Sequence, residues 1–121
     1  MKILGSIKDK TMSKGEEKMK IYNKLVRDKI PQIIEADGNR YDIRIADKEE
    51  HYELLEAKLK EEVNEFLEGK NLDELADIME VLYGLADNMG YSEEDLNKRR
   101  VEKREKRGGF KEGIVLERVY E

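Results

Sequence analysis

Acidic side chains recur at helical spacing in two neighbouring segments of the sequence. The first segment, EEVNE, contains Glu61, Glu62 and Glu65, and the second, ELAD, contains Glu74 and Asp77. Helical residues three positions apart share a side, so each segment presents its carboxylates in one direction. Mg²⁺ prefers such hard oxygen ligands and keeps coordination positions for water and phosphate oxygens. If the two helices pair, the sequence predicts a divalent-cation site at their seam.

A structural explanation of the same carboxylates competes with the metal site. Glu74 follows Asn71 at the spacing of an N-terminal capping box, and glutamate-rich helices are usually solvated surfaces. For paired carboxylates alone this explanation is the more common one. However, a helical wheel places Glu74 between Val81 and Leu85, within an apolar arc. Carboxylates crowded there would repel one another and lose hydration, which a cation would offset.

Basic side chains supply a second candidate half of a site. The stretch 98–107 contains seven Lys and Arg residues against two Glu. A helix there would align one amide and three guanidinium groups on a single side, which suits a chain of phosphates. These residues are Asn97, Arg100, Arg104 and Arg107. Neutralisation of the helix dipole and of the acidic helices explains the cluster equally well. Nearer the start, Lys24, Arg27 and Lys29 add positive charge, for which local ion pairing is the more common explanation.

Three long helices are expected to position these side chains. The first follows the Asp47 cap and stops at Gly69, with Leu55, Leu59, Val63 and Phe66 on one stripe. The second runs from Asn71 to Gly90, and the joint at Lys70 predicts an antiparallel hairpin. The third opens with Ser92 and Asp95 as a capping box and ends at Gly108 and Gly109.

The remaining segments predict minor elements. Spacing of apolar residues over 22–38 indicates a short helical piece, with Pro31 interrupting it. Alternation in 41–45 predicts a brief strand, which is expected to pair with a second one within 110–120. Residues 1–20 are interpreted as a loosely held tail, with Met19 as an alternative start, and residues 21–121 as one domain.

Composition narrows the functional classes. The chain has no cysteine and a single histidine, His51, which excludes disulfides and histidine-rich metal sites and favours a cytoplasmic protein. No stretch is long enough to span a membrane, and the net charge of −5 argues against binding to a nucleic-acid polymer. Apolar residues cover over half of the second long helix, so more than one neighbour is needed and an oligomer is expected.

Taken together, these features resemble the MazG-like all-α NTP pyrophosphohydrolase superfamily. Its signature, EExxE followed by ExxD on the next helix, matches the two acidic segments. The opening YNKLVRDKIP and the basic helix that leads into RGGF resemble the branch that is similar to phosphoribosyl-ATP pyrophosphohydrolases. The resemblance covers residue 21 to near the C-terminus. The gap between Glu65 and Glu74 is shorter than in most MazG proteins, which leaves base selectivity undefined.

The resemblance implies an all-α fold in which the helical hairpin completes a four-helix bundle by dimerisation. It implies Mg²⁺, or Mn²⁺, as cofactor and hydrolysis of a nucleoside triphosphate-like substrate to the monophosphate and pyrophosphate. The metal ligands would be Glu62, Glu65, Glu74 and Asp77, with Glu61 positioning the attacking water. Phosphate contacts would come from Lys24, Arg27, Arg100, Lys103, Arg104 and Arg107. Two alternatives stay open: phosphoribosyl-ATP hydrolysis in histidine biosynthesis, and a helical dimerisation module without catalysis.

Overall fold

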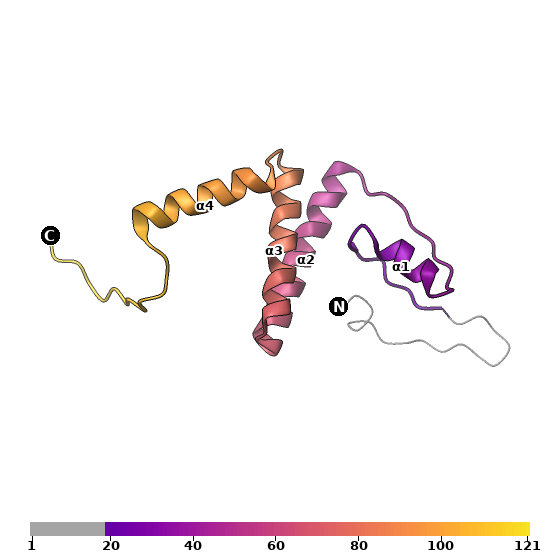
Figure 1. Cartoon of the computed structure of the whole chain (residues 1–121), viewed down its shortest axis with the longest axis horizontal. Coiled ribbons are helices and arrows are strands. Elements are labelled where there is room, and N and C mark those ends of the chain that lie inside the picture. Colours follow the sequence, from indigo (N-terminus) through magenta and orange to yellow (C-terminus); the bar gives the residue numbers. More distant parts are fainter. Residues whose placement is uncertain (1–18) are drawn as a thin grey trace. The chain divides into compact units, whose positions relative to one another are not determined.

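The computed structural model describes residues 19–121, and four helices lie within them (Figure 1). The expected tail, residues 1–20, therefore falls almost entirely outside the described residues. The chain divides into two compact units, of which the second is Glu62–Glu121. The division falls inside one continuous helix, Lys48–Gly69.

Helix α1, Ile30–Ala36, is shorter than the helical piece expected over 22–38. Pro31 lies in its first turn and begins the helix, whereas an interruption at this proline was expected. Proline favours this position because the first helical N–H groups have no partner within the helix. The residues from 22 to 29 are consequently non-helical, although Ile30 is buried.

Helix α2, Lys48–Gly69, begins and ends where the sequence predicts. The Asp47 carboxylate accepts a hydrogen bond from the Glu50 backbone N–H at 2.8 Å, which caps the first turn. Arg44 donates to both carboxylate oxygens of Glu50, at 2.6 and 2.7 Å. Along the predicted apolar stripe burial is uneven, because Leu55 is buried whereas Val63 is 37% exposed. The buried side of α2 instead continues from Leu55 to Glu62.

Helix α3, Leu72–Asn88, follows α2 after a turn at Lys70. Lys70 has a φ of 50°, the left-handed conformation that commonly ends a helix. The Asn71 side chain then accepts a hydrogen bond from the Glu74 N–H at 3.0 Å and caps α3. The chain thus reverses within two residues, which confirms the predicted hairpin between the end of α2 and α3.

Helix α4, Glu93–Arg107, follows a turn in which Gly90 has a φ of 94°. The Tyr91 N–H donates to the Ala86 carbonyl oxygen at 2.8 Å, so the turn also closes the end of α3. The Ser92 hydroxyl accepts from the Asp95 N–H and the Asp95 carboxylate accepts from the Ser92 N–H. Both halves of the predicted capping box are therefore present.

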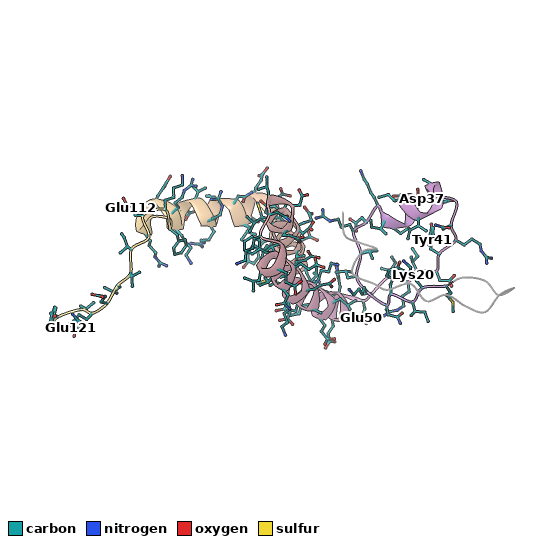
Figure 2. All side chains as sticks on the ribbon, turned by 90° about the horizontal axis from the view of Figure 1, so that it is seen from below. Lys20, Asp37, Tyr41, Glu50, Glu112 and Glu121 are labelled. Carbon is teal, nitrogen blue, oxygen red and sulfur yellow. The ribbon has the colours of Figure 1, made fainter. Side chains whose placement is uncertain are left out.

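The expected strand pair is not seen in the part of the chain that the structure describes. Residues 41–45 and 110–120 are irregular, and Figure 2 shows the chain from Glu112 to Glu121 continuing without a helix or strand. Their apolar side chains are exposed, with 89% of Ile45 and 81% of Ile114 open to solvent. Two short strands alone gain too little burial to be stable, which explains the absence.

The apolar side of α3 is largely exposed. Side chains spaced three and four residues apart along it retain much of their accessible surface, and they are Leu72, Leu75, Met79, Leu82 and Met89. Ala86 lies within this stripe and is buried, and Val81, on another side of α3, is buried as well. Among residues 19–121, no helix combines the length and apolar character needed to cross a membrane.

Candidate metal centre

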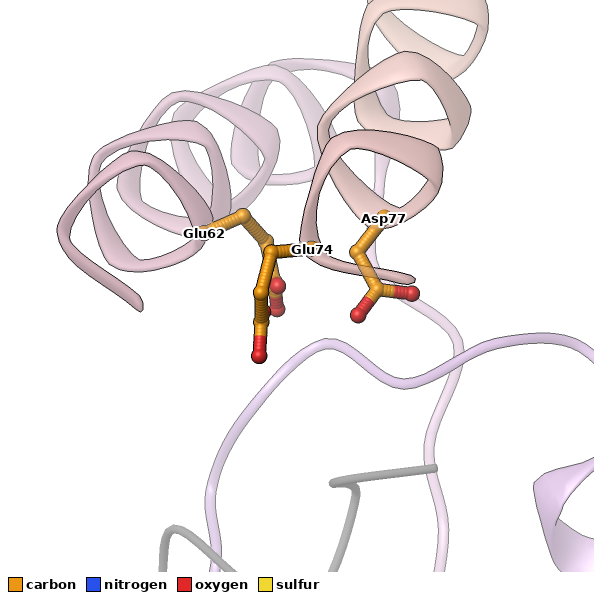
Figure 3. Close-up of side chains that lie close together, drawn as sticks. All are labelled: Glu62, Glu74 and Asp77. Carbon is orange, nitrogen blue, oxygen red and sulfur yellow. The ribbon is translucent and has the colours of Figure 1, made fainter. Parts of the chain in front are cut away.

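Three carboxylates converge where the end of α2 lies beside the start of α3. One oxygen from each of Glu62, Glu74 and Asp77 lies within 4.8 Å of the other two. Figure 3 shows the three side chains leaving their helices toward a common region. Glu62 is 6% exposed and Glu74 is 3% exposed, while Asp77 is half-buried. The cluster is therefore largely removed from solvent.

Local structure explains how the hairpin places these residues. The Asn71 cap fixes the first turn of α3, and Glu74 and Asp77 follow on one side of it. Gly69 ends α2 beside them, and a Cβ atom there would lie 3.2 Å from Asn71 Nδ2 and 3.5 Å from Glu74 Oε1. An added Cβ would crowd the Asn71 side-chain amide and would make ordinary van der Waals contact with Glu74. The Glu74 side chain therefore belongs to the carboxylate cluster, a place that the capping of α3 alone does not explain.

The hydrogen bonding of the cluster fits a hard cation. The Oε2 atoms of Glu62 and Glu74 are both buried, and neither accepts a hydrogen bond. A buried carboxylate oxygen that accepts no hydrogen bond has lost its contact with water, and no hydrogen bond replaces that contact. Mg²⁺ and Mn²⁺ are suited to carboxylate oxygens, and three carboxylates leave coordination positions for water and phosphate. The residues present therefore fit the expected metal.

Glu65, the fourth expected ligand, is not part of the group of converging oxygens. It lies one turn after Glu62 in α2 and is half-buried. Because residues three apart share a helix side, its backbone position is compatible with a ligand role. The structure brings together three of the four expected ligands.

Glu61 is engaged by lysine side chains. Lys24 Nζ lies 2.9 Å from Glu61 Oε1, and Lys58 Nζ lies 3.8 Å from Glu61 Oε2. Partial burial pushes the pKa of Glu61 upward, but the Lys24 hydrogen bond and the charges of both lysines outweigh burial and place this pKa below its usual value. Glu61 therefore stays ionised, which makes it a weak acceptor for a proton from water.

The basic row on α4 differs from the carboxylate cluster in its surroundings. Arg100, Lys103, Arg104 and Arg107 are all exposed. Asn97 is half-buried, and its Oδ1 accepts a hydrogen bond from the Tyr83 hydroxyl at 3.1 Å. Helix α4 starts beyond the end of α3 that is opposite to Glu74, about 20 Å along the helix axis. Figure 1 shows α4 leading away from that end of α3, so within this unit the helix that carries the arginines does not lie beside the start of α3.

Some contacts of the candidate residues were not predicted from the sequence. Lys58 lies three residues before Glu61, and this helical spacing is a signal that predicts the pairing. The Tyr83 hydroxyl of α3 donates a hydrogen bond to Asn97 of α4. No local pattern identifies that contact, since it joins two helices. Arg27, expected as a phosphate contact, is exposed in the non-helical segment before α1.

Comparisons with protein-family models, with curated proteins and with solved structures found no match to this chain.

Proposed function

We propose that the protein is a Mg²⁺-dependent pyrophosphohydrolase of the MazG-like type, acting on a nucleoside triphosphate or a similar compound. The observation that carries the proposal is the convergence of three carboxylate oxygens within 4.8 Å, two of them from side chains at most 6% exposed. Gathering buried carboxylates costs folding free energy on the order of several kcal/mol unless opposite charge compensates. Binding of a cation explains such a group of carboxylates more readily than a contribution of the carboxylates to folding stability does.

In the proposed reaction, water adds to the α-phosphorus and the bond from that phosphorus to the bridging oxygen breaks. The monophosphate and pyrophosphate leave, and one proton is released. Glu62, Glu74 and Asp77 would hold the metal, with Glu65 joining them. When bound, Mg²⁺ or Mn²⁺ would neutralise charge on phosphate oxygens and lower the pKa of water. The protein's own contribution is to hold these carboxylates in a largely water-excluded seam.

The substrate's phosphate chain requires positive charge as well. Arg100, Lys103, Arg104 and Arg107 remain the proposed contacts, with Asn97, Lys24 and Arg27. Guanidinium groups bind phosphate in bidentate fashion and keep their charge at physiological pH. Helix α4 begins at the end of α3 that is far from Glu74. We therefore propose that the basic residues of α4 contact a substrate held by the carboxylates of a second chain.

We propose a homodimer in which the exposed side of α3 packs against a second copy. The apolar residues from Leu72 to Met89 recur at alternating spacings of three and four, the pattern that packs helices into bundles. Two hairpins would together make the four helices that such a bundle needs. Sedimentation equilibrium should give twice the chain mass, whereas Met79→Lys should yield monomers. A monomeric wild-type chain at micromolar concentration contradicts the dimer.

The test of the activity is direct. Purified protein is incubated with a panel of ribo- and deoxyribonucleoside triphosphates and Mg²⁺, and products are separated. The expected products are the monophosphate and pyrophosphate, and EDTA should abolish their formation. Release of the γ-phosphate alone, or no turnover of any panel member, would count against the proposal. Growth of a histidine auxotroph that carries the gene would instead favour phosphoribosyl-ATP as substrate.

The exposed side of α3 equally suits a dimerisation module without catalysis. The two proposals differ in what happens to Glu62→Gln and Glu74→Gln. In a module, Mg²⁺ should not change the melting temperature of the wild type or of either variant. An enzyme should lose turnover and the effect of Mg²⁺ on melting.

A further inference from the structure

We infer that the α3 helices of two copies pair antiparallel in a single register, and that this pairing brings the start of the partner's α4 beside each carboxylate cluster. The inference rests on the proposed homodimer and specifies its orientation, its register and the partner's place at the site. All of the residues concerned belong to the second unit, Glu62–Glu121.

The apolar stripe of α3 has the same spacing when it is followed from either end. Its members are separated by three, four, three, four and three positions, and they are Leu72, Leu75, Met79, Leu82, Ala86 and Met89. Antiparallel helices related by a two-fold axis place the first member opposite the last, the second opposite the fifth and the third opposite the fourth. A parallel pair would place Ala86 opposite Ala86 and leave that layer poorly filled, whereas the antiparallel pair places Leu75 there.

The exposure of the larger side chains agrees with this register. Leu72 is 79% exposed and Met89 is 63% exposed, so the outermost pair joins the two most exposed members of the stripe. Met79 and Leu82, which form the central pair, are 50% and 39% exposed. Each of these side chains would therefore lose apolar surface to an apolar side chain of the partner, which favours association.

The distribution of charge favours the antiparallel orientation. The first half of α3 carries four carboxylates and no Lys or Arg, and the carboxylates belong to Asp73, Glu74, Asp77 and Glu80. The other end of α3 leads into α4, where the stretch 98–107 contains seven Lys and Arg residues against two Glu. In a parallel pair the two acidic halves would lie together and repel. In an antiparallel pair each acidic half lies beside the end from which the partner's basic helix continues.

The orientation gives the partner a place at the carboxylate cluster. Glu74 lies in the first turn of α3, and the turn at Gly90 follows the end of this helix. When Leu72 faces the partner's Met89, the start of the partner's α4 lies beside the end of α3 that carries Glu74. The chain's own α4 begins about 20 Å away along the helix axis. The partner's α4 therefore begins nearer to the carboxylates than the chain's own α4 does.

Engineered cysteines test the pairing without requiring activity, because the chain has no cysteine of its own. A disulfide needs Cα atoms within about 7 Å of each other. On mild oxidation, the full chain carrying both Leu72→Cys and Met89→Cys should become a covalent dimer in more than about half of the molecules. Leu72→Cys alone and Met89→Cys alone should each stay below about a tenth, since an antiparallel pair holds the two copies of either residue about 25 Å apart.

Non-reducing electrophoresis measures the covalent dimer, and mass spectrometry of the linked peptides identifies the cysteines that are joined. Leu72→Cys combined with Asp87→Cys is the matched control, because Asp87 is exposed near the same end of α3 but lies off the stripe. This control should not cross-link. Leu72 and Met89 are both exposed within one chain, so their substitution should leave it folded, and circular-dichroism melts verify this.

Cross-linking of Leu72→Cys alone would show a parallel pair and overturn the inference. A dimer in which the variant with both cysteines does not cross-link overturns the register. Failure of the proposed homodimer gives a different result, in which wild type sediments as a monomer and no variant cross-links. Failure of the proposed activity is separate again, since absence of nucleotide turnover leaves the pattern of cross-links unchanged.

Discussion

The acidic seam between α2 and α3 and the basic row on α4 look alike in the sequence but differ in the structure. Both consist of charged residues at helical spacing. In the seam, Glu62 and Glu74 are buried and their oxygens converge with those of Asp77. On α4, Arg100, Arg104 and Arg107 are exposed. Helical spacing determines which residues share a side, whereas the neighbour of that side determines whether their charges meet.

The difference has a thermodynamic meaning. Exposed arginines keep their hydration, so placing them on α4 costs little folding free energy. Buried carboxylates lose hydration and repel one another, so their placement requires compensation. The seam is therefore where a ligand is expected to change the stability of the protein, and α4 is where substitutions should change substrate binding alone.

The largest expected effect is on turnover in the seam. Glu62→Gln and Glu74→Gln should each reduce kcat/KM by roughly 100-fold or more, since even indirect partners of a metal contribute 10- to 100-fold. Initial-rate assays at saturating Mg²⁺ measure this loss. Glu56→Gln, an exposed glutamate of α2, is the matched control and should retain wild-type rates. Equal rates in all variants would contradict a role in turnover for the buried carboxylates of the seam.

Metal addition should stabilise the seam strongly. At a Mg²⁺ concentration about 100 times the dissociation constant, linkage adds about 2.7 kcal/mol to the free energy of unfolding. Thermal melts with Mg²⁺ and with EDTA measure this effect in wild type. Glu74→Gln should melt higher than wild type in EDTA, because one buried charge is removed, and should gain little from Mg²⁺. Glu80→Gln, which is exposed on α3, should behave as wild type does.

Substitutions on α4 should act on binding with little effect on folding. Arg100→Ala and Arg104→Ala should each raise KM about tenfold, since a hydrogen bond to a charged group contributes about 1.5 kcal/mol. Their melting temperatures should stay within about 2 °C of wild type, because both side chains are exposed. Arg99→Ala is the control, as Arg99 pairs with Glu102 at 3.9 Å. A large loss of stability in Arg100→Ala would show that the row is structural.

The smallest effect concerns pH at the start of α4. Hydrogen bonds from the Ser92 backbone N–H and hydroxyl lower the pKa of Asp95 below its ordinary value of 3.8. A lowered folded-state pKa adds stability above that ordinary value, and the contribution disappears as pH falls through the lowered pKa. Carboxyl NMR titration should show the low pKa in wild type and a rise toward the ordinary value in Ser92→Ala. An unchanged Asp95 titration in that variant would contradict the role of the hydroxyl.

Much of the helical framework could be predicted from the sequence because its determinants are local. Asp47 caps α2, Asn71 caps α3, and Ser92 with Asp95 caps α4, each through hydrogen bonds between residues three apart. Pro31 was interpreted wrongly because an apolar spacing suggested a helix across it. The strands expected at 41–45 and 110–120 were not found in the described residues, since a strand requires a partner that no local pattern supplies.

The sequence by itself determined which residues are candidates for the site, because helical periodicity places Glu62 beside Glu65 and Glu74 beside Asp77. Only the tertiary structure decided that Glu62, Glu74 and Asp77 converge, and that Glu61 binds Lys24 from a segment 37 residues earlier. The physical reason is the distance along the chain over which each interaction acts. Periodicity and capping act within one or two helical turns, whereas burial and ion pairing depend on which surfaces the folded chain brings together.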